Sequence, residues 1–306
     1  MAHIITYGGL WLFVSPNVFS KTGAGFSMQL MGKLFRFGFP LVFAMSGDLI
    51  TQASALFFLS YFLNLEQVAI YSLGYKIAQI ASMILILPFQ LAYEPFVYAH
   101  INKPEIRVTI AKLLTYLILA FVFVAFGIAF VSRDLLRVIA PPEYFSAYLV
   151  IFLILPGIAF TGVYYIGESL LHIRNKTYIT GITVTVTTVL SVLLNYLLIP
   201  RWGIYGIIVV FNVTIISTAV LLMILGVKAF PIRLELRRLG IAGILLVSSL
   251  TTVFLLSETS PYIYYSVLPI VVCAGMAFIY FGNFCDNHEK AVLRDVLHGI
   301  LSKAPP

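Results

Sequence analysis

The chain has 306 residues, of which 61% are apolar and only 10% are charged. Soluble domains carry about 45–50% apolar and about 25% charged residues, so this composition excludes a soluble globular enzyme and an intrinsically disordered protein. The mean hydropathy of +1.02 indicates a protein that uses lipid as its solvent.

The first 33 residues precede the first long apolar stretch and form a separate segment. Residues 4–14 are apolar, but 11 residues are too few to cross the hydrocarbon core of a membrane. They lack the basic start and the cleavage site of a secretory signal. We interpret this stub as an interfacial piece or as the end of a helix that begins before Met1.

Eight apolar stretches are long enough to cross a bilayer, because a helical span needs about 20 apolar residues. Barrel strands would be shorter and would alternate, and backbone groups in lipid must bond within their own segment. The sequence therefore predicts an all-α polytopic membrane protein. Pro40, Pro88 and Pro156 lie within or at the edges of spans and predict bends. The spans are expected at residues 34–63, 68–93, 110–132, 145–166, 178–200, 204–227, 239–256 and 262–281.

We expect three parts after the stub. The first six spans, within residues 34–227, form one lobe, and two further spans follow within residues 228–284. Residues 285–306 have apolar side chains at helical spacing, which predicts an amphipathic tail on the cytoplasmic leaflet.

The basic residues give the orientation of the spans. Of the 19 Lys and Arg residues, 15 fall on the side of the stub, and Arg133, Arg137 and Arg201 fall on the other side. Lys76 lies within a span. Because Lys and Arg concentrate in cytoplasmic loops, both termini are expected in the cytoplasm. The basic residues sit at the ends of apolar stretches and not on one solvent face, so we expect no nucleic-acid partner.

Polar side chains inside four of the spans are the candidate functional residues, because such residues usually face a bundle interior or a water-filled path. At 1.5 Å per residue, Asp48 lies about 21 Å and Lys76 about 12 Å from the outer ends of their spans. Polar residues of the second span fall within an arc of about 60° at 100° per residue. Four such stripes predict a hydrophilic cavity. Its candidate transport-pathway residues are Asp48, Gln52, Ser72, Lys76, Gln79, Gln90, Glu94, Glu168, His172 and Asn195.

Other roles remain open for parts of these stripes. Glu94, Glu168 and His172 lie near the predicted cytoplasmic boundary, where solvent can reach them, and Lys76 could extend its ammonium group to the membrane surface. For the hydroxyl stripe of the fifth span, packing between helices is the favoured explanation; the stripe comprises Thr180, Thr183, Thr187 and Ser191.

The sequence offers no motif for catalysis or for metal binding. It has no P-loop, no GxGxxG, no GxSxG and no His-rich or carboxylate-rich external loop. Cys273 and Cys285 have no accompanying Cys/His cluster. We therefore expect no catalytic residue, metal or cofactor. Asp48 or Glu94 would serve any coupling of transport to H⁺ or Na⁺.

Two stretches go beyond composition. Residues 59–78 begin Leu59-Ser-Tyr-Phe, and residues 194–206 contain Asn195-Tyr-Leu-Leu-Ile-Pro200-Arg-Trp-Gly203. Both resemble bacterial polysaccharide biosynthesis proteins of the O-antigen flippase type, which belong to the multidrug/oligosaccharidyl-lipid/polysaccharide exporter superfamily. Phe37-Gly-Phe-Pro40 is similar to the start of the seventh helix in that family.

The resemblance implies a protein of two six-helix lobes around a central cavity. The spans here would correspond to helices seven to fourteen, the C-terminal half with two extra helices, and the stub to the end of helix six. The chain departs from the family where many members carry an Asp-Arg pair, because those positions are Ala55 and Leu56. Asp48 lies two turns earlier on nearly the same helix face.

The resemblance also implies a function. We expect a flippase for undecaprenyl-linked sugar repeat units, such as those of O-antigen and lipopolysaccharide, in the bacterial inner membrane. Its partners would be membrane lipids and either a missing N-terminal lobe or other polysaccharide-assembly proteins. The alternatives are a small-molecule exporter of the same superfamily, a membrane enzyme acting on lipid-linked glycans, and an inactive half-length fragment.

Overall fold

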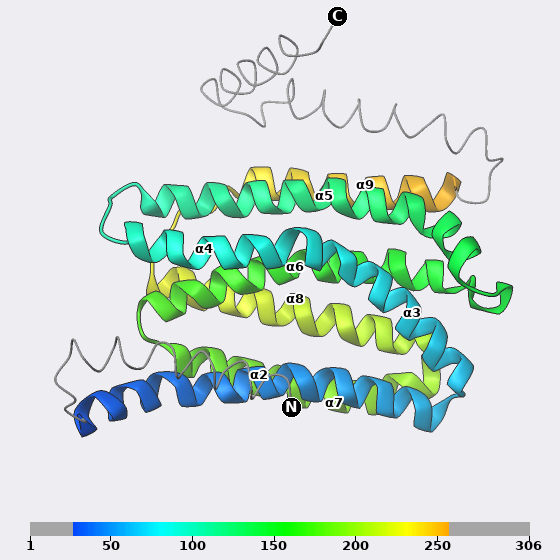
Figure 1. Ribbon diagram of the computed structural model, residues 1–306, viewed down its shortest axis with the longest axis horizontal. Coiled ribbons are helices and arrows are strands. Elements are labelled where there is room, and N and C mark those ends of the chain that lie inside the picture. The colour runs from blue at the N-terminus through cyan, green and yellow to red at the C-terminus, as the bar shows by residue number, and fades with distance from the viewer. Residues whose placement is uncertain (1–26, 257–306) are drawn as a thin grey trace, which may run out of the picture.

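The computed structural model describes residues 27–256 (Figure 1). The predicted eighth span, most of the stub and the amphipathic tail lie outside the described residues. The described part consists of helices joined by short turns and contains no strand. An all-α polytopic membrane protein is thereby confirmed.

Seven helical segments within residues 27–256 are long and apolar enough to cross a membrane, and they match the first seven predicted spans. Most extend beyond the prediction, because hydropathy marks only the part in hydrocarbon while the helix continues through polar residues at the interface. Two short segments, η1 and η2, lie within or beside them. The elements are α2 (Met28–Phe62), α3 (Leu65–Ala81), η1 (Ser82–Ile86), α4 (Leu87–His100), α5 (Ile106–Ile139), η2 (Pro142–Tyr144), α6 (Ala147–Ile173), α7 (Thr177–Trp202), α8 (Ile204–Ala229) and α9 (Leu236–Leu256).

Local sequence explains where several helices start and stop. The side chain of Ser27 accepts a hydrogen bond from Leu30 N at 3.2 Å, and that of Asn64 accepts one from Gln67 N at 2.9 Å. Both are N-cap contacts that satisfy free backbone donors. Gly203 joins α7 to α8 with φ of 56°, a conformation that favours glycine. These caps and turns hold α2 against α3 and α7 against α8 without long loops.

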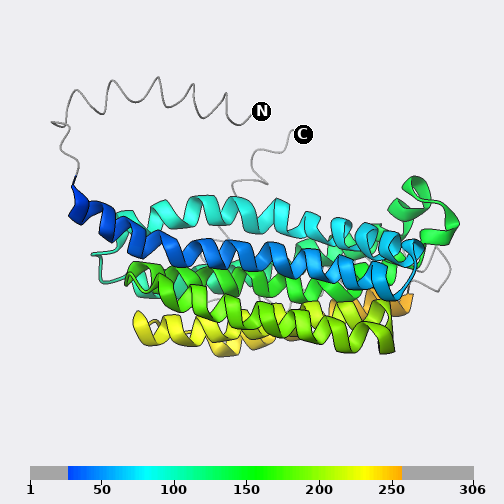
Figure 2. The same cartoon turned by 90° about the horizontal axis from the view of Figure 1, so that it is seen from below.

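The helices run roughly parallel in three layers (Figures 1 and 2). The pair of α2 and α7 forms one edge, α5 and α9 form the opposite edge, and α3, α4, α6 and α8 lie between them. The centre of the bundle is α6, which contacts α3, α5 and α8. Its buried apolar side chains, Ile151, Ile154, Leu155 and Ile158 among them, make up much of the main hydrophobic cluster. The bundle therefore has a dry half around α5, α6 and α9.

The helix of the second span is continuous from Leu65 to His100 but changes type in the middle. Residues Ser82–Ile86 form a π-helical turn, in which Leu87 N donates to Ser82 O. Pro88 follows directly, and because proline has no N–H, it cannot close the ordinary α-helical bond. The wider turn accommodates the backbone hydrogen bond that Pro88 cannot donate, and such turns occur often at functional sites.

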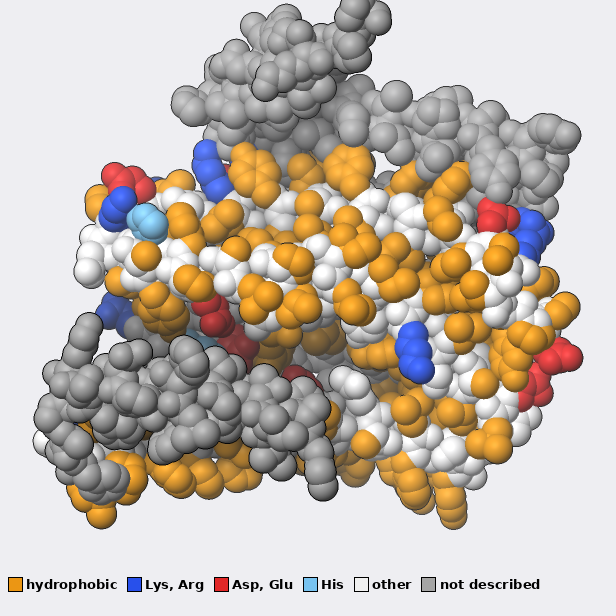
Figure 3. All heavy atoms as spheres, viewed as in Figure 1, with side chains coloured by type: hydrophobic (Ala, Val, Ile, Leu, Met, Phe, Trp, Pro, Cys, Tyr) orange, Lys and Arg blue, Asp and Glu red, His pale blue; other side chains and the backbone are white. Residues whose placement is uncertain are grey.

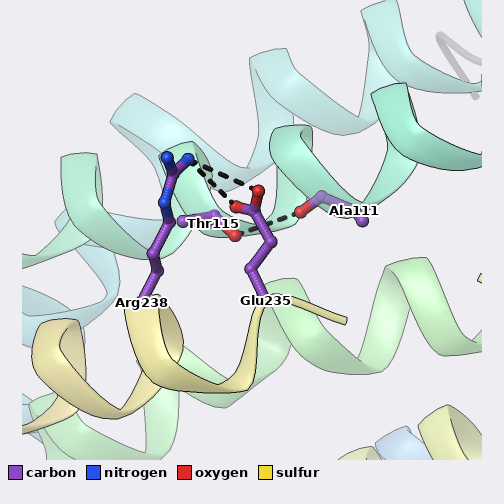
Figure 4. A network of polar contacts seen from close by, with 4 residues as sticks. All are labelled: Ala111, Thr115, Glu235 and Arg238. Atoms are coloured by element: carbon purple, nitrogen blue, oxygen red, sulfur yellow. Dashed lines mark hydrogen bonds and ion pairs between the residues drawn. The ribbon is translucent and has the colours of Figure 1, made fainter. Parts of the chain in front are cut away.

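Polar contacts lie within each of the two helices where the start of α9 packs beside α5 (Figure 4). Arg238 Nη1 lies 3.3 and 3.4 Å from the two carboxylate oxygens of Glu235, and Thr115 Oγ1 donates to Ala111 O at 3.1 Å. Only 11% of the Arg238 side chain is exposed, so breaking this ion pair would leave a buried charge. These contacts serve stability, far from the polar stripes.

Glycines allow α6 and α8 to approach backbone to backbone. A Cβ added to Gly167 would lie 2.6 Å from Met223 N and 2.8 Å from Leu222 C, and a Cβ on Gly226 would lie 2.5 Å from Gly167 O. Small residues at helix crossings in membranes permit this close packing. Backbone atoms cannot rotate away, so these positions require glycine.

Replacing Gly167 by alanine is expected to lower the free energy of unfolding by about 1–3 kcal/mol, the usual cost of overpacking a core. The matched control is Gly127→Ala, because an added Cβ at Gly127 on α5 meets nothing within 4 Å. Thermal unfolding of the purified variants in detergent measures both. Equal unfolding temperatures for Gly167→Ala and the unaltered protein would contradict the close contact.

Candidate functional site

A cavity of about 460 Å³ lies between the α2–α7 pair and the helices α3, α6 and α8. In Figure 3 the surface is hollowed beside α2, with acidic side chains along one part of the hollow and a Lys or Arg side chain further along. No residue of α5 or α9 lines this cavity. Its polar lining comprises Asp48, Thr51, Gln52, Ser72, Lys76, Gln79, Ser82, Thr161, Thr187, Thr188, Ser191, Asn195, Thr214 and Thr218.

The structure brings together six of the ten candidate residues. Asp48 and Gln52 reach the cavity from α2, Asn195 reaches it from α7, and Ser72, Lys76 and Gln79 reach it from α3. The remaining four, Gln90 and Glu94 on α4 and Glu168 and His172 on α6, do not line it. The hydroxyl stripe of α7 divides in the same way, since Thr187 and Ser191 line the cavity and Thr180 and Thr183 do not.

The π-helical turn explains why the stripe of the second span splits. A uniform 100° per residue places Gln90 and Glu94 on the same face as Lys76. The turn at Ser82–Ile86 holds an extra residue, which changes the direction of every later side chain by about the angle of one residue, 100°. Gln90 and Glu94 therefore face away from the wall formed by α3.

Two close helix contacts position the charged residues. A Cβ on Gly47 would lie 2.7 Å from Thr188 Oγ1, so α2 packs tightly on α7 immediately before Asp48. A Cβ on Gly74 would lie 2.8 Å from Ala147 O, which places α3 equally close to α6 two residues before Lys76. In each case the glycine faces the neighbouring helix and the charged residue faces the cavity.

Asp48 and Lys76 are exposed within the hollow of the bundle. Among residues 27–256, neither side chain takes part in an ion pair. The difference of about 9 Å between their predicted levels, from the rise of 1.5 Å per residue, is in keeping with this separation. Both charges are free to bind a ligand.

Aromatic side chains form the apolar part of the wall. Tyr71 and Tyr75 of α3 stack with ring centroids 5.8 Å apart, and Tyr75 meets Phe211 of α8 edge-on at 5.6 Å. Gln79 Nε2 donates to the hydroxyl of Tyr75 at 2.6 Å. Tyr164 and Tyr165 of α6 complete the aromatic lining. Flat rings beside amide and hydroxyl groups suit a ligand that has both apolar faces and many hydroxyls.

The tyrosines of α3 were missed by the search for polar stripes, because hydropathy counts tyrosine as nearly apolar. Their spacing nevertheless indicates that they lie beside the polar stripe. Tyr71 and Tyr75 are four residues apart and each precedes a polar residue of the stripe, Ser72 and Lys76. Residues four apart share a helix face.

The wall of α7 and α8 holds polar atoms that lack a protein partner in the described part of the chain. They are Ser191 Oγ, Thr214 Oγ1 and both side-chain polar atoms of Asn195. Ser191 and Asn195 are each only 1% exposed. Buried polar groups are normally hydrogen-bonded, so these atoms add unused hydrogen-bonding capacity directly behind the cavity surface.

A comparison of the sequence with family models adds an independent finding. Residues 1–100 match the model of polysaccharide biosynthesis proteins. The resemblance of this part of the chain to the polysaccharide biosynthesis family is thereby confirmed. The match includes α2, α3 and η1 and ends with α4, so it contains both charged residues of the cavity. Searches of curated proteins and of solved structures found no match.

The correspondence to the C-terminal half of a two-lobe protein stays a prediction, as does the resemblance of residues 194–206, which lie outside the matched segment. Ala55 and Leu56, the positions that the predicted correspondence pairs with the Asp-Arg of the family, line the cavity. The cavity therefore carries two charged side chains, Asp48 and Lys76, among the described residues that line it.

Proposed function

We propose that the protein is a flippase that carries a lipid-linked oligosaccharide across the bacterial inner membrane by alternating access. The observation that supports this most is the polar and aromatic cavity inside a bundle of membrane-spanning helices. The family match and the spans fit a polysaccharide transporter rather than an enzyme. The cargo we propose is a polysaccharide or O-antigen repeat unit on undecaprenyl pyrophosphate.

The physical need for such a cavity follows from the cargo. A sugar hydroxyl or amide without a hydrogen-bond partner in hydrocarbon costs several kcal/mol, so an oligosaccharide cannot cross lipid unaided. The hydroxyl and amide groups of the cavity would replace water around the sugars, and the tyrosines would stack on their apolar faces. The polyprenyl tail would remain in the bilayer, which provides the same solvent on both sides.

Lys76 would attract the pyrophosphate group as a point charge, because charge-assisted hydrogen bonds to phosphate are among the strongest in proteins. We further propose that H⁺ or Na⁺ drives the cycle. Asp48 in the cavity and Glu94 on α4 are the carboxylates that the sequence offers for this purpose. The distribution of Lys and Arg supports an orientation with both termini in the cytoplasm.

Proteoliposomes that contain undecaprenyl-pyrophosphate oligosaccharide test the proposal. A membrane-impermeant glycosidase cleaves only glycans in the outer leaflet, so transport appears as slow cleavage of the glycans that start inside. We expect this slow phase with the protein and not in protein-free liposomes. A fluorescent phospholipid in the same vesicles should stay in its leaflet.

Three outcomes would contradict the flippase. Equal movement of the phospholipid would indicate unselective lipid scrambling. Movement of a cationic dye without movement of the glycan would support a small-molecule exporter. A change in the mass of the lipid-linked glycan would support an enzyme that acts on it.

A further inference from the structure

A second polar site lies outside the cavity, between the side chains of Glu168 and His172. The two residues are one turn apart on α6, and Glu168 Oε1 lies 3.6 Å from His172 Nε2. Only 16% of the Glu168 side chain and 14% of the His172 side chain are exposed. His172 Nε2 itself is fully buried and has no hydrogen-bond partner among the described residues. The pair is thus aligned across a gap slightly longer than a hydrogen bond.

The surroundings hold this pair in place. The ring of His172 meets the ring of Phe37 of α2 edge-on at 6.0 Å. Gly167, immediately before Glu168, is in backbone contact with α8. Arg174, two residues beyond His172, is occupied elsewhere, since its Nε donates to Ala229 O and its guanidinium lies over the Phe230 ring. No nearby cation therefore neutralises Glu168 through this part of α6.

The charged groups that act most strongly on Glu168 are both acidic. They are Asp48 of α2 and Glu94 of α4. The hydroxyls of Tyr164 and Tyr165 interact electrostatically with Glu168 and Asp48. Neither α7 between Tyr178 and Tyr196 nor α8 between Tyr205 and Lys228 carries a titratable side chain. Lys76 of α3 lines the cavity, and Arg107 of α5 lies over the Phe230 ring.

These acids form a series through the bundle. Asp48 belongs to the cavity, Glu168 lies outside it, and Glu94 is exposed midway along α4. Acidic side chains are visible along the hollow in Figure 3. A chain of Asp, Glu and His residues inside a membrane bundle is the usual composition of a proton relay.

We propose that Glu168 and His172 together form a proton-binding site that couples this acidic series to the movement of the cargo. This inference rests on the proposed flippase function. In the empty state Glu168 is a carboxylate and His172 is neutral, so the pair carries one negative charge. One proton from water binds between Oε1 and Nε2 and gives a neutral pair, either as carboxylate and imidazolium or as carboxylic acid and imidazole. Release of the same proton to water restores the first state.

The site fits a proton better than a metal cation. Na⁺ and other hard cations need several oxygen ligands, and here one carboxylate faces one imidazole. Among the described residues there is no group of three or more His, Cys, Asp or Glu side chains that could hold a metal ion. The buried Nε2 atom also leaves no room for a hydrated ion, whereas a proton needs only the two facing atoms.

Loading the pair changes its preference for surroundings. A net charge at this depth is costly and is repelled by Asp48 and Glu94, so the empty site favours arrangements in which water reaches it. The neutral pair has no such cost and permits α2 and α4 to close over it. Proton binding thereby biases the equilibrium between open and closed arrangements, as coupling requires.

The experiment uses the full chain in the same proteoliposomes, with either a pH gradient or a Na⁺ gradient. A pH gradient is expected to accelerate cargo movement and a Na⁺ gradient is not. With the pH gradient, the Glu168→Gln and His172→Gln variants should each move cargo only at the rate that the unaltered protein shows without a gradient. The matched control Glu143→Gln, an exposed acid in the short η2 segment, should keep the full acceleration.

A second measurement needs no transport. Infrared difference spectra of the purified protein between two pH values should contain a carboxyl band that Glu168→Gln removes and His172→Gln shifts. If the variants keep the acceleration, or if His172→Gln leaves the band unchanged, the proton site is refuted while the flippase stands. If the unaltered protein moves no glycan but shows the shared carboxyl band, the flippase is refuted and proton binding by the pair stands.

Discussion

Replacing Lys76 by alanine is expected to slow the movement of the lipid-linked oligosaccharide by about tenfold to a hundredfold. A hydrogen bond to a charged group contributes about 1.5–3 kcal/mol, and each 1.36 kcal/mol corresponds to a factor of ten in rate. Among the described residues that line the cavity, Lys76 is the one with a positive charge. No neighbouring side chain there can therefore take over its contact with a phosphate. Initial rates from the glycosidase assay measure the effect.

Two further variants separate charge from general damage. Lys76→Arg keeps a cation that binds phosphate well, so we expect it to retain more activity than Lys76→Ala. Lys228→Ala removes an exposed lysine near the end of α8, outside the cavity, and should behave as the unaltered protein does. If Lys76→Ala transports at the normal rate with normal amounts of folded protein, Lys76 does not bind the cargo.

Filling the cavity is expected to have the second large effect. Gln52→Trp puts an indole into a space of about 460 Å³ and should lower the transport rate by at least about tenfold, because the bulky ring occupies room that the cargo needs. Ala53→Trp is the matched control, since Ala53 is exposed, does not line the cavity and lies one residue further along the same helix.

Gln52→Ala distinguishes the loss of space from the loss of the amide. One neutral hydrogen bond contributes about 0.5–1.5 kcal/mol, so this variant should lose about twofold to tenfold. Equal rates for Gln52→Trp and Ala53→Trp would show that the cargo does not pass through the cavity. All three proteins should be compared at equal amounts in the membrane.

The spans were predictable because their cause is simple. Each backbone group in lipid must bond within its own segment, so a long apolar run has one solution, and seven runs within the described residues adopt it. That Asp48 and Lys76 line one cavity was also predictable, because ionisable residues in neighbouring spans share the places where lipid is absent.

Other parts of the site depend on details that periodicity does not carry. The direction of Gln90 and Glu94 depends on a π-helical turn, which appears in sequence only as a proline at position 88. The aromatic wall depends on Phe211, whose contact with Tyr75 joins two helices that are far apart in the chain. The gap of 3.6 Å between Glu168 and His172 and the contact of His172 with Phe37 are properties of the packed bundle, whereas sequence spacing alone gives only a shared helix face.

Because of the π-helical turn, the number of residues between α3 and α4 determines which side chains of α4 face the cavity. Shortening the segment Ser82–Ile86 by one residue would rotate α4 against α3 by about 100°. Gln90 and Glu94 would then point in the direction of Lys76, and a second carboxylate would face the cargo. The loss of one codon among those for residues 83–86 therefore changes the charge of the transport path without altering any side chain that lines the cavity now.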